Sequence, residues 1–154
     1  MTWTERLKQF TGLGGEPEHH EIADILPMMT LALARLGRVA ALAPTPTIQE
    51  EFAPVLTHAE AVVQRVRDVA RDFGPVSAAG RLSSLPDGHN HWARLRQALD
   101  QHREVRQRMR EVAIALEDTN PPVSQALSEI GREEDRVIDR LRDLIALADP
   151  QALN

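Results

Sequence analysis

Two apolar stripes in the second half of the chain are each interrupted by one titratable residue. Over residues 92–116, apolar side chains recur at alternating steps of three and four, which is typical of one helix face, and His102 lies in the middle of the stripe. Over residues 123–148 the pattern recurs with Glu134 in its middle. A charge on a buried stripe costs several kcal/mol unless it has a partner. We therefore expect both residues to be paired, and each is a candidate partner for the other.

Four helical patterns account for most of the 154 residues, and no segment predicts a strand, so the expected fold class is all-α. The predicted helices cover residues 17–42, 47–73, 90–118 and 120–149. The first begins later if Asp24 is its N-cap. Thr47 and Glu50 form a capping box for the second helix. Asn120 caps the fourth, with Pro121 at its first helical position.

The lengths of the loops predict the topology. The turns after the first and third helices span a few residues, so each of these helices forms an antiparallel hairpin with the next. Fully extended, the 16 residues 74–89 between the hairpins reach roughly 50 Å, whereas a helix of about 27 residues is roughly 40 Å long. This linker can cross the whole bundle and make the second and third helices parallel, or it can be an excursion at one end. We favour the crossover, because loops of this length are uncommon without a role.

A short amphipathic arm precedes the bundle, which divides the chain into an arm over residues 1–15 and a four-helix domain over 16–150. Trp3, Leu7 and Phe10 lie on one side of a short predicted helix in the arm, and a glycine-rich segment follows. The apolar side of the arm either packs back on the bundle or docks on a second copy or another protein.

The crossover topology places three potential metal ligands near the middle of the bundle. It puts His58 and His102 at nearly the same height, and Glu134 within one turn of His102. Two interpretations are open. In the first, a buried His102–Glu134 hydrogen bond fixes the register of the helices, and His58 is half exposed. In the second, His58, His102 and Glu134 bind one divalent ion of iron, zinc or manganese.

A crossed-over four-helix bundle with polar residues at mid-height resembles the ferritin-like superfamily, including its rubrerythrin-type members. Residues 133–144 are similar to the last metal-binding helix of such proteins. That family builds its di-iron site from a glutamate on each of two helices and a Glu-x-x-His motif on each of the other two. Here Glu134-x-x-Val137 lacks the histidine, and Val55-x-x-His58 lacks the glutamate. The resemblance therefore implies a ferritin-like fold whose di-iron motif is mostly lost.

Composition narrows the classes of function. The absence of cysteine excludes disulfides and thiolate metal sites. With a net charge of −5 and acids interspersed among the arginines, we expect no nucleic-acid partner, and we interpret the arginines between Arg103 and Arg110 as a solvated face. No stretch approaches the roughly 18 apolar residues of a membrane span, and the N-terminus lacks the apolar region of a signal peptide. We therefore expect a cytoplasmic protein without a membrane span.

No catalytic motif in the sequence points to a reaction. No nucleophile–base–acid set, glycine-rich phosphate loop or paired-carboxylate cleft can be assembled from these residues. The sequence favours a helical protein that acts through association, as a homodimer or with a helical protein partner. The alternative is a metal-binding protein with a redox or oxygen-related role, in which His58, His102 and Glu134 hold iron, zinc or manganese.

Overall fold

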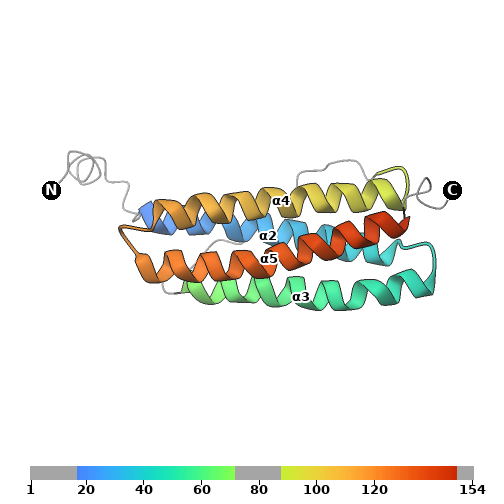
Figure 1. The fold of residues 1–154 in the computed structure, drawn as a ribbon, viewed down its shortest axis with the longest axis horizontal. Helices are drawn as coiled ribbons and strands as arrows, with labels where there is room; N and C mark the ends of the chain where they lie inside the picture. Colours follow the sequence, from blue (N-terminus) through green and yellow to red (C-terminus); the bar gives the residue numbers. More distant parts are fainter. Residues whose placement is uncertain (1–16, 72–87, 149–154) are drawn as a thin grey trace.

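The computed structural model describes residues 17–71 and 88–148, and these two ranges contain helices and turns but no strand. The helices are α2 (Pro17–Ala41), α3 (Pro46–Arg71), α4 (His91–Ala115) and α5 (Pro121–Ala148) (Figure 1). The expected all-α fold with four long helices is confirmed for this part of the chain. The expected arm at its N-terminus and most of the expected linker lie outside the described residues. None of the described helices is long and apolar enough to cross a membrane.

The observed starts of the helices decide between the expected caps. α2 begins at Pro17 and runs through Asp24, so the earlier of its two expected starts is the observed one. α3 begins at Pro46, and the Oγ1 atom of the preceding Thr45 accepts a hydrogen bond from the Ile48 backbone N–H at 3.3 Å. The expected capping box at Thr47 is therefore wrong. The fixed backbone angle of proline suits the first helical position, which moves the cap to Thr45.

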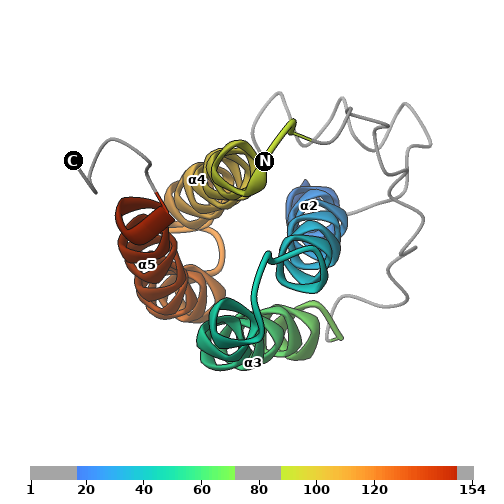
Figure 2. The ribbon, with the colours of Figure 1, turned by 90° about the vertical axis from the view of Figure 1, so that its right-hand side faces the viewer.

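The four helices form a closed ring in cross-section, in which each helix packs on two neighbours in the order α2, α3, α5, α4 (Figure 2). α3 and α4 lie on a diagonal of this ring and run in the same direction (Figure 1). Side-chain contacts agree with these directions. Near the starts of α3 and α4, the ring centroids of Phe52 and His91 are 5.9 Å apart. Asp24, early in α2, pairs with Arg108, late in α4, as antiparallel neighbours require. α3 therefore ends, and α4 begins, at opposite ends of the bundle.

Aliphatic side chains from all four helices fill the core. Three polar residues of the described ranges are buried with them: His102, Ser124 and Glu134 are 3%, 9% and 2% exposed. Burying polar groups among aliphatic ones is unfavourable unless they are hydrogen-bonded. The contacts of these three residues therefore mark the parts of the core that do more than pack apolar side chains.

Candidate functional site

A histidine on α4 and a glutamate on α5 meet in the middle of the core. Nδ1 of His102 lies 2.5 Å from Oε1 of Glu134. Each residue lies on the apolar stripe that its helix turns inward, and α4 packs directly on α5, so the two interruptions face each other. The expectation that each residue is the partner of the other is confirmed.

The remaining surroundings of this pair are apolar. The space beside it leaves no room for a water molecule, and its other lining residues are Met29, Ala32, Leu33, Ala59, Val63 and Val105. Nε2 of His102 is buried without a hydrogen-bond partner. A hydrogen on this nitrogen would be a buried unsatisfied donor, which costs about 1–3 kcal/mol. The arrangement therefore favours an imidazole ring that carries its hydrogen on Nδ1, directed at Glu134.

His58 on α3 is partly exposed, as the first interpretation expected, and it has a partner that the sequence did not predict. Its Nε2 lies 2.8 Å from Oε2 of Glu133, and both side chains are partly exposed. The hydrogen bond from His58 lowers the pKa of Glu133 below its ordinary value, and the positive charge of Arg136 lowers it further. Consecutive residues of a helix point about 100° apart. Glu134 therefore faces α4 and the core, while Glu133 faces α3 and the surface.

The structure therefore pairs His102 with Glu134, which are two of the three candidate metal ligands. The third, His58, lies at the same height but is paired with Glu133. Within the described ranges, no group of three His, Asp or Glu side chains is arranged to hold a metal ion. The binding of iron, zinc or manganese by His58, His102 and Glu134 stays a prediction.

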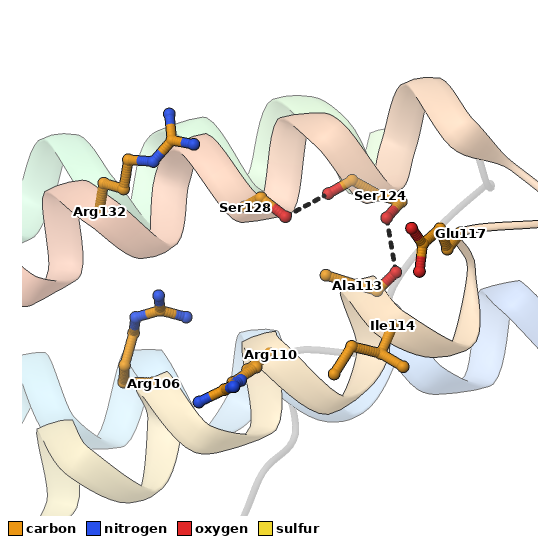
Figure 3. A pocket seen from close by; sticks show the side chains of 8 residues that line it. All are labelled: Arg106, Arg110, Ala113, Ile114, Glu117, Ser124, Ser128 and Arg132. Carbon is orange, nitrogen blue, oxygen red and sulfur yellow. Dashed lines mark hydrogen bonds between the residues drawn. The ribbon is translucent and has the colours of Figure 1, made fainter.

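An open hollow of about 430 Å³ lies between α4 and α5 (Figure 3). It is lined by Arg106, Arg110, Ala113, Ile114, Glu117, Ser124, Ser128 and Arg132. The sequence patterns did not predict this hollow. Two spacings could have found it, since Arg106 and Arg110 are one turn apart on α4, and the polar residues from α5 recur every four residues. These spacings do not give the register of α4 against α5, which sets the two rows of polar residues opposite each other.

Hydrogen bonds fix the two serines of this hollow. The Ser124 hydroxyl donates to the Ala113 carbonyl at 2.5 Å, which ties α5 to the last turn of α4. The Ser128 hydroxyl donates to the Ser124 carbonyl at 3.0 Å. Both hydroxyl hydrogens are therefore engaged with backbone, and the arginines supply the donors that remain for a ligand.

A second surface depression, of about 340 Å³, lies between α3 and α5. It is lined by Glu51, Pro54, Val55, Arg140, Asp143, Leu144 and Leu147. We call it the α3–α5 groove. Its apolar lining and its mixed charges distinguish it from the arginine-rich hollow on the other side of α5.

Over residues 17–71 and 88–148, the fold is an all-α four-helix bundle with a histidine–glutamate contact at its centre. No protein-family model, curated protein or solved structure matches the chain. Membership of the ferritin-like superfamily therefore stays a prediction from the sequence.

Proposed function

We propose that this protein is a ferritin-like four-helix bundle without an intact di-iron centre, and that it acts mainly by associating with a second copy of itself. The common direction of α3 and α4 supports a ferritin-like crossover, because these helices end and begin at opposite ends of the bundle. A ferritin-like di-iron site takes carboxylates from all four helices. Beside His102 and Glu134, the side chains that α2 and α3 contribute are apolar, which supports the loss of that centre.

The exposed leucine at the α3–α5 groove is the observation that carries self-association. Leu147 is 66% exposed, and the partly buried Leu144 adds apolar surface beside it, while Val55 lines the groove from the core. Removing apolar surface from water contributes roughly 25 cal/mol per Å². Covering this groove with another helical surface is therefore favourable.

The charges along the groove match a second copy of the same surface. Arg140 lies beside two acids, Glu51 and Asp143, and none of the three makes an ion pair within the described residues. In a two-fold symmetric dimer the same patch of both subunits meets, so a residue of one copy can face a different residue of the other. Arg140 of each copy can then pair with an acid of the other copy, at the rim of an apolar contact.

Sedimentation velocity over a range of protein concentrations tests this dimer. Leu147→Glu places a charge in the centre of the contact, so we expect it to weaken dimerisation at least about tenfold. Ile114→Glu is the matched control, because Ile114 is similarly exposed, at 62%, but lies in the hollow between α4 and α5. It should dimerise like the unmodified protein.

Two outcomes would contradict the proposal. A chain that stays monomeric at every concentration would exclude self-association and leave a helical partner of another kind. Equal loss of the dimer in Leu147→Glu and Ile114→Glu would show that the α3–α5 groove is not the interface.

One observation favours the alternative, a metal-binding protein. Nε2 of His102 has no hydrogen-bond partner within the described structure, and it can act as a nitrogen ligand only if the apolar side chains beside it move apart to admit an ion. Binding of one iron, zinc or manganese ion by His102, Glu134 and His58 would require His58 to leave Glu133. Elemental analysis of untagged protein purified without chelator separates the two proposals. About one equivalent of metal, lost in His102→Ala, would support the alternative, and metal-free protein that takes up none of the three ions would exclude it.

A further inference from the structure

Three arginines line the hollow between α4 and α5. Figure 3 shows Arg106 and Arg110 on the α4 side and Arg132 on the α5 side. Nε of Arg106 donates to Asp135 at 2.9 Å, while Arg110 and Arg132 make no ion pair with any residue of the described ranges. Elsewhere, arginines such as Arg71 pair with an acid one turn away on their own helix. Single unpaired arginines, such as Arg67 and Arg140, occur elsewhere in the described ranges, whereas the hollow is lined by two of them together with a third arginine.

The local charge of the hollow is positive although the chain as a whole carries −5. Three arginines line it together with one acid, Glu117, and Asp135 is bonded to Arg106 from its edge, which leaves one positive charge in excess. Guanidinium groups held around one space repel each other unless an anion lies between them. A concave site of one sign also concentrates ions of the opposite sign.

The two ends of the hollow are electrostatically different. Glu117 and the C-terminus of α4 lie at one end, where carboxylate charge and the negative end of the helix dipole disfavour an anion. The guanidinium groups of Arg106 and Arg132 lie toward the other end (Figure 3). An anion is therefore expected between the arginines, away from the two serines.

A glycine on α5 makes room for one of these arginines. A Cβ atom added at Gly131 would lie 2.6 Å from Nη1 of Arg106 and 2.8 Å from its Cζ. The guanidinium of Arg106 therefore lies closely against the backbone of α5, and only Nε is engaged with Asp135. Its two terminal nitrogens keep hydrogens for a ligand.

We propose that this hollow binds a phosphate group, either as free phosphate or as the headgroup of a small phosphate ester. One guanidinium can donate to both oxygens of a carboxylate. A phosphate is tetrahedral and presents oxygens in several directions, so it suits guanidinium groups that approach from two helices. The volume of about 430 Å³ exceeds what a phosphate ion alone needs. Ala113 and the exposed Ile114 form an apolar wall for the organic part of an ester.

Isothermal titration calorimetry on the full chain tests this site, with inorganic phosphate and phenyl phosphate as separate probes. The ionic strength is held constant, because screening alone changes the affinity of exposed charges. We expect one phosphate per chain, and a dissociation constant that rises about tenfold in Arg110→Gln and in Arg132→Gln. Arg67→Gln is the matched control. It removes the same charge from an exposed, unpaired arginine of α3 and should change the dissociation constant less than about twofold.

Phenyl phosphate distinguishes the two sources of the phosphate group. Tighter binding of phenyl phosphate than of inorganic phosphate, lost in Ile114→Ala, supports an ester as the ligand. Equal binding of both probes supports free phosphate. Circular dichroism spectra should show that all variants keep their helix content, since the substituted side chains are exposed.

The phosphate proposal fails if neither probe binds, or if Arg67→Gln weakens binding as much as Arg110→Gln and Arg132→Gln, which would indicate attraction to charge in general. Leu147→Glu should bind phosphate like the unmodified chain, because Leu147 lies in the α3–α5 groove. The phosphate site and the proposed dimer can therefore fail independently of each other.

Discussion

At the scale of single residues, the His102–Glu134 contact has a testable energetic signature. Glu134→Ala leaves Nδ1 of His102 without a partner and opens a cavity in the core, so we expect a loss of about 3–5 kcal/mol of unfolding free energy. The double variant His102→Leu with Glu134→Leu removes the unpaired Nε2 as well and restores apolar packing. It should be more stable than Glu134→Ala in urea unfolding followed by circular dichroism. A double variant that is less stable than Glu134→Ala would show that the pair contributes more than the packing that replaces it.

The sequence predicts a contact between residues only where helix periodicity alone determines that contact. His102 and Glu134 interrupt stripes of period 3.6, so their burial and their pairing could be predicted. The partner of His58 could not, because the choice between Glu133 and Glu134 depends on the rotation of α5 about its own axis. The grouping of Arg106 with Arg132 likewise depends on the register of two helices, which no single stripe contains.

At the scale of a helix, two glycines inside α2 and α5 allow a matched comparison. Alanine is favoured over glycine within a helix by up to about 1 kcal/mol. A Cβ at Gly37 in α2 meets nothing within 4 Å, so Gly37→Ala should gain most of this amount. In Gly131→Ala the new methyl group displaces the guanidinium of Arg106 and weakens its partly exposed pair with Asp135.

Thermal unfolding of the two glycine variants checks this comparison, and Gly131→Ala should gain less stability than Gly37→Ala without unfolding the bundle. A loss of more than about 2 kcal/mol in Gly131→Ala would contradict it, since an ion pair at the surface is worth at most about 1 kcal/mol.

The starts of the helices were predicted well where the capping residues were unambiguous. Asn120 accepts a hydrogen bond from the Val123 backbone N–H at 3.4 Å, and α5 begins at Pro121 as expected. At the start of α3, Thr45 and Thr47 both suit an N-cap, and only Thr47 has an acidic residue, Glu50, three positions later, yet the position of Pro46 places the cap at Thr45. Local residues therefore fix that a helix exists, while its exact start depends on which of two competing caps is used.

At the scale of the whole bundle, His91 of α4 contacts Phe52 of the diagonally opposite α3, and the burial of His91 should make stability depend on pH. Burial lowers the pKa of His91, and the charge of Arg94 lowers it further, while Nδ1 has no hydrogen-bond partner in the described structure. The unfolded chain, with an ordinary histidine pKa of about 6.5, therefore takes up a proton before the folded chain does, so stability is lost as the pH falls below about 6.5. Glu133 acts in a lower pH window, because its lowered pKa preserves stability until the pH falls below its ordinary value of 4.5.

Between about pH 7.5 and pH 5.5, the melting temperature of His91→Gln should consequently fall less than that of the unmodified protein. His89→Gln, at an exposed neighbouring position, is the control and should fall as much as the unmodified protein. Equal falls in all three would mean that protonation of His91 does not oppose folding, and that its contact with Phe52 is held by packing alone.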